Sequence, residues 1–311
     1  MAVREPGAGA LAVPGPDEPA GSPAPEVAAA RGSWRLMLAT FAENPLALAG
    51  VGLVVLIVAF CFIGPLLYKT NQVTVNLNIN NIRPGGKYPL GTDNDGFNVL
   101  GRLMVGGQSS LELGFAVSIA TSVIGTLYGA IAGLAGGLVD AVMMRIVDTF
   151  LALPTLVLLL ILVNVFPPSL WVIILLITAL SWLSVARLVR GEVLTLRERE
   201  YVQAVRAMGG SSWRIVTRHL IPNSVGVIIV NATFTIADAI LYLSALSFLG
   251  LGPPPPEVDW GGMLSNGLDF LFDGYWWLVY PAAIILILTV VAFNLIGDAI
   301  RDSLDVRLQR R

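Results

Sequence analysis

Side chains able to do acid–base chemistry are scarce in this chain, and the most informative is Asp238. It is the only acid in the apolar run 220–256, where Asn231 and Thr235 add further polar groups. A carboxylate inside a membrane span is costly, so it marks a water-filled path or a paired polar site by default. We expect Asp238, Asn231 and Thr235 to line a translocation pathway; a hydrogen-bonded structural acid is the open alternative.

Nothing in the sequence predicts catalysis. His219 has no second ligand or nucleophile near it, and Cys61 is the only cysteine, so it forms no internal disulfide. The sequence contains no Gly-rich loop ending in Lys-Ser/Thr, no His-Glu-x-x-His pair and no nucleophile elbow. We therefore expect a non-enzymatic protein without a metal or cofactor. Any energy that it uses must come from another protein.

The segment Tyr201–Asn223 is a short, arginine-bearing insert between long apolar runs, YVQAVRAMGGSSWRIVTRHLIPN. Glycine weakens helix continuity, so Gly209–Gly210 predicts a turn between two short helices. Pro222 is expected to close the insert. A compact helical knob on an otherwise apolar chain is suited to contact a soluble partner, with Ala204, Met208 and Ile215 as its apolar contacts.

The elements around these residues are predicted to be membrane helices. The 311 residues are 55% apolar and only 13% charged, whereas soluble domains carry about 25% charged residues. A span needs about 20 apolar residues as helix, and Phe166–Ser169 divides one 38-residue uncharged run, 149–186, into two spans. The predicted fold is an all-α polytopic membrane protein with six spans, near 46–68, 110–136, 142–165, 169–190, 224–250 and 276–297.

Basic residues predict the orientation, because cytoplasmic loops are enriched in Lys and Arg. With the N-terminus inside, 15 of the 19 basic residues lie on the inner side, and the insert 200–222 lies there too. Residues 1–33 are rich in Ala, Gly and Pro, which predicts a disordered cytoplasmic tail. The remaining expected parts are the first span with its external loop (34–107), a core of five spans (108–298) and a cytoplasmic C-terminal tail (299–311).

Two smaller patterns predict packing. Gly125, Gly129, Gly133 and Gly137 recur every four residues, so they should share one helix face that a neighbouring helix approaches closely. Arg145 and Asp148 are three residues apart, which predicts an ion pair at the start of the third span.

Several motifs in this order resemble dipeptide/oligopeptide (nickel) permease C subunits of ATP-binding-cassette (ABC) importers. The insert resembles the "EAA" loop of bacterial ABC import permeases through Gln203-Ala204-Val205, Gly209, Ile215 and Leu220-Ile221-Pro222. Further matches, which run from about residue 34 to 305, are Tyr88–Gly96, Gln108–Gly114, Met144–Asp148 with Leu153-Pro154, Leu246–Gly252 and Trp260–Met263.

The chain departs from the family pattern at three places. Gln203-Ala204-Val205 stands where the family has Glu-Ala-Ala, so a charge is absent. Gly96-Phe97-Asn98 stands where Gly-Arg-Asp is usual, and Leu243 stands where a glutamate often precedes the Ser-Phe-Leu-Gly run.

The resemblance implies a type I importer membrane domain in the cytoplasmic (inner) membrane, with both termini inside. It implies a second homologous permease subunit, two ATP-binding subunits, an external substrate-binding lipoprotein or periplasmic protein, and lipid as partners, but no nucleic acid. The insert would couple ATP hydrolysis to transport through Gln203, Ala204, Met208, Gly209, Ile215 and Pro222. Peptides would be the substrate, with nickel chelates or oligosaccharides as alternatives and an ion-coupled secondary transporter as the rival function.

Overall fold

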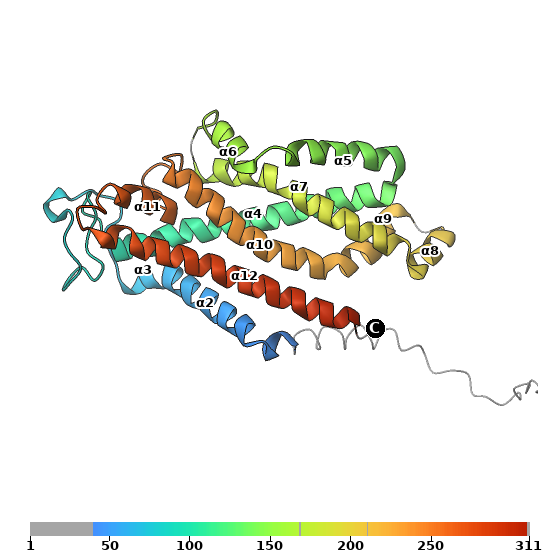
Figure 1. Ribbon diagram of the computed structural model, residues 1–311, viewed down its shortest axis with the longest axis horizontal. Helices are drawn as coiled ribbons and strands as arrows, with labels where there is room; N and C mark the ends of the chain where they lie inside the picture. Colours follow the sequence, from blue (N-terminus) through green and yellow to red (C-terminus); the bar gives the residue numbers. More distant parts are fainter. Residues whose placement is uncertain (1–39, 168, 210, 310–311) are drawn as a thin grey trace, which may run out of the picture.

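In a computed structural model, which describes residues 40–309 apart from 168 and 210, the chain forms an elongated bundle of helices (Figure 1). The described residues contain no β-strand, only two isolated bridges in the loop that precedes α4 (Val99–Ala135). The predicted disordered tail, residues 1–33, lies outside the described residues.

Five helical segments are long and apolar enough to cross a membrane, and a bent pair of helices accounts for the sixth expected span. The all-α polytopic fold is thus confirmed. The five segments are Pro45–Leu67 (α2, Pro45–Phe62, with α3, Gly64–Leu67), α4, α7 (Leu170–Arg197), Val216–Phe248 (η2, Val216–Leu220, with α10, Ile221–Phe248) and Trp276–Leu304 (η3, Trp276–Leu278, with most of α12, Tyr280–Gln309).

The third expected span, 142–165, is broken into α5 (Gly137–Leu151) and α6 (Thr155–Val163), which meet at 78°. Pro154 lies in the gap between them. Proline has no N–H and disfavours helical geometry in the residue before it, so the first helix ends ahead of the pair Leu153-Pro154. After α6 a second break separates it from α7, where the Ser169 side chain accepts a hydrogen bond from the N–H of Val172 at 3.3 Å.

The two ends of the bundle differ (Figure 1). One end, which we call the insert end, carries α8 (Glu200–Ala207) and α9 (Ser212–Ile215). The beginning of α2 and the end of α12 lie toward this end. The opposite, loop end carries the segment 69–98 with η1 (Leu77–Ile79), and α11 (Trp260–Leu268). α12 continues as helix through 299–309, the segment expected as a C-terminal tail.

Close packing between α4 and α7 depends on three of the four glycines with period four. A Cβ on Gly125 would lie 2.5 Å from the Val185 Cβ, and one on Gly129 would lie 2.3 Å from the Ala186 carbonyl oxygen. Gly133 faces Val193 in the same way. Gly137 is not part of this contact, contrary to the prediction. It begins α5 with a φ of +53°, and nothing lies within 4 Å of its Cβ position, because the chain has already turned away from α4.

Two ion pairs join α5 to α7. Arg190 binds Asp140 through two hydrogen bonds, 3.0 Å from Nε to Oδ1 and 2.6 Å from Nη2 to Oδ2. Asp148 pairs with Arg187, so the predicted pair of Asp148 with Arg145 is wrong. The spacing of Arg145 and Asp148 along one helix would permit a pair, but the packing of α5 on α7 places Arg187 beside Asp148 instead.

Candidate functional site

The insert is anchored to the bundle by one side of its helices. Val202 of α8 is buried, as are Ile215, Val216 and Leu220. These side chains form one apolar cluster with residues of α4 and α7, including Val193. The insert therefore has a fixed base, and its orientation follows that of the bundle.

Hydrogen bonds at the end of α7 stiffen the same base. The Gln203 amide nitrogen Nε2 donates to the Glu198 carbonyl oxygen at 3.2 Å. The Arg197 Nη1 donates to the Gly133 carbonyl oxygen at 3.0 Å, which ties α7 to α4. The glutamine that departs from the Glu-Ala-Ala pattern thus donates a bond that an ionised glutamate could not donate.

Ile215 is not an exposed contact, contrary to the prediction. Its side chain is 1% exposed, because it packs into the cluster beneath α8. Gln203, Ala204 and Met208 are exposed, and Met208 retains 79% exposure. The structure thus separates the predicted coupling residues into a buried anchor and an exposed tip.

Gly209 ends α8 with a φ of +80°, in the left-handed region that favours glycine. Its N–H donates to the Arg206 carbonyl oxygen at 3.0 Å, as expected for a helix C-terminus. Nothing lies within 4 Å of its Cβ position. A larger residue there would be disfavoured by backbone strain and not by lack of space.

Pro222 does not close the insert, contrary to the prediction. The chain is helical without interruption from Ser212 to Phe248, and Pro222 lies in the first turn of α10. The five residues before it form the π-helical turn η2, where the Ile221 N–H donates to the Val216 carbonyl oxygen. A π turn can hold a helix continuous next to a proline, and the Asn223 side chain binds the His219 carbonyl oxygen at 2.6 Å.

An open hollow of about 520 Å³ lies beside the exposed tip, lined by Val205, Met208, Gly209, Arg214, Arg218 and His219. Neither Arg214 nor Arg218 forms an ion pair with another described residue. Within the described part of the chain, no three His, Cys, Asp or Glu side chains could hold a metal ion. The hollow combines an apolar edge with two free cations, which suits an acidic or amphipathic protein surface.

The predicted pathway residues share one face of α10. Asn231, Thr235 and Asp238 follow spacings of four and three, which place them on neighbouring turns of one side. Thr235 is buried, unlike Asp238, and its hydroxyl donates to the Asn231 carbonyl oxygen at 2.8 Å. Asp238 is exposed, and no hydrogen bond or ion pair to another described residue is found for it. Its side chain therefore points out of the subunit.

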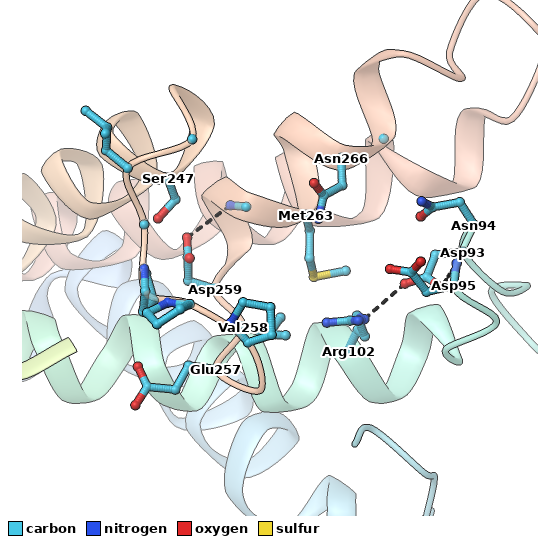
Figure 2. Close-up of a pocket in the computed structure, with 18 of the residues that line it drawn as sticks. Asp93, Asn94, Asp95, Arg102, Ser247, Glu257, Val258, Asp259, Met263 and Asn266 are labelled. Atoms are coloured by element: carbon cyan, nitrogen blue, oxygen red, sulfur yellow. Dashed lines mark hydrogen bonds and ion pairs between the residues drawn. The ribbon is translucent and has the colours of Figure 1, made fainter. Parts of the chain in front are cut away.

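A second pocket, of about 570 Å³, lies at the loop end (Figure 2). We call it the loop-end pocket. Its lining comes from the segment 93–95, the first turn of α4, the end of α6 with the residues after it, the segment that joins α10 to α11, α11 itself and Leu278. Its charged lining side chains are Asp93, Asp95, Arg102, Glu257 and Asp259.

Arg102 and Asp93 form an ion pair on one side of this pocket, with Nε 3.0 Å from Oδ2 (Figure 2). Burial raises the pKa of Asp93, and the charge of Arg102 opposes that shift. The Arg102 guanidinium lies 3.9 Å from the centre of the Phe97 ring. Asn98 caps α4 by accepting from the Gly101 N–H at 3.1 Å. Phe97 and Asn98, which depart from the family pattern, therefore have structural roles.

Asp259 and Ser247 are buried on the other side of the pocket. Asp259 caps the N-terminus of α11. Its Oδ1 accepts hydrogen bonds from the N–H groups of Gly261 at 2.8 Å and Gly262 at 3.1 Å. Burial raises the pKa of Asp259, against the effect of these donors and of the nearby Ser247 hydroxyl. Ser247 points toward Asp259 (Figure 2), but its hydroxyl makes no hydrogen bond of normal geometry within the described structure.

Sequence reasoning missed this pocket and α11. The available signal was Asp259 immediately before Trp260-Gly261-Gly262, since aspartate is a favoured N-cap.

Comparison with protein families identifies two matching regions. Residues 125–310 match the model of the binding-protein-dependent transport system inner membrane component. Residues 32–84 match the N-terminal transmembrane domain of oligopeptide transport permease C. The first match covers more than half of the chain and includes the whole insert.

Individual relatives resemble the chain over most of its length. It is 36% identical to the dipeptide transport system permease protein DppC of Bacillus subtilis (strain 168), over 92% of this chain and 88% of the relative. It is 38% identical to the oligopeptide transport system permease protein OppC of the same organism, over 89% and 90%. It is 37% identical to the probable D,D-dipeptide transport system permease protein DdpC of Escherichia coli (strain K12), over 84% and 88%.

Proposed function

This chain belongs to the family of binding-protein-dependent transport system inner membrane components, and we propose that it carries di- or oligopeptides across the cytoplasmic membrane as one permease subunit of an ABC importer. Peptide is the substrate class because the similar proteins are named for dipeptide and oligopeptide transport. The chain itself hydrolyses nothing, and separate ATPase subunits supply the energy.

The main support for this proposal is that the insert combines a buried base with an exposed tip. Its base is held by a buried cluster that includes Val202, Ile215 and Leu220, and its tip presents Ala204 and Met208 to solvent. A rigid base transmits force, and an exposed apolar tip gains free energy by docking, at about 25 cal/mol per Å² of apolar surface buried. Closure of an ATPase dimer on the tip would thus tilt α7 and α10, which continue directly from the insert.

The insert end is the cytoplasmic end in this proposal. The beginning of α2, the end of α12 and the insert lie toward one end of the bundle (Figure 1), and the basic residues of the sequence favour the cytoplasm for all three. The loop end then faces an external binding protein, which delivers the substrate.

The translocation pathway would lie along the outward face of α10. The Asp238 side chain points out of the subunit and has no ion-pair partner among the described residues. A second homologous permease subunit would cover it and enclose a polar channel with the half-buried Asn231, whereas Thr235 is buried within this subunit. Alternating access would expose this channel to one side of the membrane and then to the other. In a free-standing span an unpaired carboxylate would instead face lipid, which is strongly unfavourable.

Reconstitution tests the proposal directly. The permease, co-expressed with its candidate partner subunits and purified, should carry ATPase subunits with it. In proteoliposomes, uptake of labelled dipeptides should require ATP and the binding protein. Uptake driven by an ion gradient without ATP would contradict the proposal and favour a secondary transporter with Asp238 as its ion site. Competition by nickel chelates or oligosaccharides, but not by peptides, would reassign the substrate.

A further inference from the structure

The loop-end pocket has an excess of negative charge that nothing in the described chain neutralises. Four carboxylates and one guanidinium line it, and that guanidinium, Arg102, is already paired with Asp93. The remaining acids are Asp95, Glu257 and Asp259. None of them forms an ion pair with another described residue.

A buried hydroxyl in the pocket wall also lacks a hydrogen bond of normal geometry. Ser247 is 4% exposed and lines the pocket, and its hydroxyl points toward Asp259 without making a hydrogen bond of normal geometry to any described residue. The Asp259 Oδ1 is occupied by two N–H groups of α11, and neither of these bonds uses Oδ2. An unpaired buried hydroxyl is costly, so Ser247, beside the carboxylate of Asp259, favours a ligand that supplies hydrogen-bond donors.

The side chains that line the pocket favour an organic cation as its ligand. The carboxylates do not converge as a metal-binding group within the described residues; they are spread around a space of about 570 Å³. An ammonium or guanidinium group on a flexible stem could enter such a space and donate several hydrogen bonds at once.

The position of the pocket separates it from the proposed pathway. Ser247 follows Asp238 on α10 by nine residues, which is about two and a half turns and therefore the opposite face of the helix. Ser247 lies on the side of α10 that packs toward α4 and α11, whereas Asp238 points out of the subunit. The pocket wall at Ser247 and the proposed pathway at Asp238 therefore lie on opposite faces of α10.

We propose that the loop-end pocket is a docking socket for a lysine or arginine side chain of the external binding protein. This assignment rests on the proposed function. The exposed Glu257 and the half-buried Asp95 attract the cation, and the buried Asp259 and Ser247 accept its hydrogen bonds. Because close opposite charges fix register as well as affinity, the socket would orient the binding protein over the permease.

The test uses the complete transporter in lipid nanodiscs and its purified, peptide-loaded binding protein. The test variant combines Asp95→Asn and Glu257→Gln; neither side chain makes a hydrogen bond or ion pair to another described residue, so the fold should be retained. Asp259 stays unchanged because it caps α11. The matched control combines Asp269→Asn and Asp273→Asn, two exposed acids at the same end but outside the pocket lining.

The test variant should raise the Kd for the binding protein at least about tenfold at low ionic strength. Its Kd should also depend less on salt, because screening acts on the charges that were removed. The control variant should have the same Kd and the same salt dependence as the unaltered complex. In both variants, the ATPase activity measured without binding protein should equal that of the unaltered complex. A lysine or arginine of the binding protein should then show a non-additive effect with Glu257→Gln in a double-mutant cycle.

Other outcomes overturn the proposal. Equal Kd and equal salt dependence in test and control variants would remove the socket and leave the proposed function intact. Unchanged Kd with reduced uptake only of peptides that carry a free amino terminus would assign the pocket to the passing peptide instead. If the unaltered complex does not bind the binding protein at all, the proposed function fails together with the socket.

Discussion

Met208→Ala should weaken the binding of the ATPase subunit without weakening the fold. Met208 is 79% exposed at the tip of the insert. Full burial of a methionine side chain stabilises by about 1.5–3 kcal/mol, so docking of the exposed part gives about 1.2–2.4 kcal/mol. Because alanine keeps the Cβ, we expect the Kd to rise roughly 5- to 20-fold. The free energy of unfolding should change by less than about 0.5 kcal/mol, as for surface substitutions elsewhere.

Ile215→Ala is the matched contrast, since it lies beneath the same tip and is 1% exposed. It should lower the free energy of unfolding by about 2–5 kcal/mol through the lost packing and the cavity. The assay is titration of labelled ATPase subunit onto the permease in nanodiscs, paired with thermal unfolding of each variant in detergent. An unchanged Kd for Met208→Ala, or loss of stability equal to that of Ile215→Ala, would refute the division of the insert into tip and anchor.

Three further substitutions test other parts of the structure. Asp238→Asn should reduce peptide uptake while the complex assembles normally; unchanged uptake kinetics would remove Asp238 from the pathway. Gly129→Ala should lower the melting temperature, because the new Cβ would lie 2.3 Å from the Ala186 carbonyl oxygen and overpacking costs about 1–3 kcal/mol. Gly191→Ala should leave the melting temperature unchanged, because no atom lies within 4 Å of its Cβ position. Gln203→Glu should reduce the amount of peptide transported per ATP hydrolysed, since it loses the hydrogen bond to the Glu198 carbonyl oxygen. Gln203→Lys keeps a donor and should retain the transport ratio of the unaltered protein. An equal ratio in the unaltered protein and both variants would contradict a positioning role for this side chain.

Much of the fold follows from local pattern. Uncharged runs of sufficient length identified the spans, and the pair Leu153-Pro154 coincides with the bend between α5 and α6. The prediction for Pro222 is wrong, because a proline in the first turn of a helix cannot be told from sequence alone from one that follows a helix end. The π turn before it, which keeps the helix continuous, is visible only in the structure.

Contacts between distant segments could not be predicted in the same way. The partner of Asp148 is Arg187 and not Arg145, because spacing within a helix says nothing about which other helix packs beside it. The burial of Ile215 has the same origin, since apolar residues in an amphipathic insert can anchor it or contact a partner equally well.

The sequence by itself determined the class of protein, the number of expected spans and the location of the insert, because these depend on composition and on periodicity along the chain. Only the tertiary structure decided which insert residues are exposed. It also decided that the Asp238 side chain points out of the subunit without an ion-pair partner, and that acids from residues 93–95 and 257–259 surround one pocket. The physical reason is that burial, pairing and enclosure arise from segments far apart in sequence, and side-chain chemistry alone does not specify which of these segments meet.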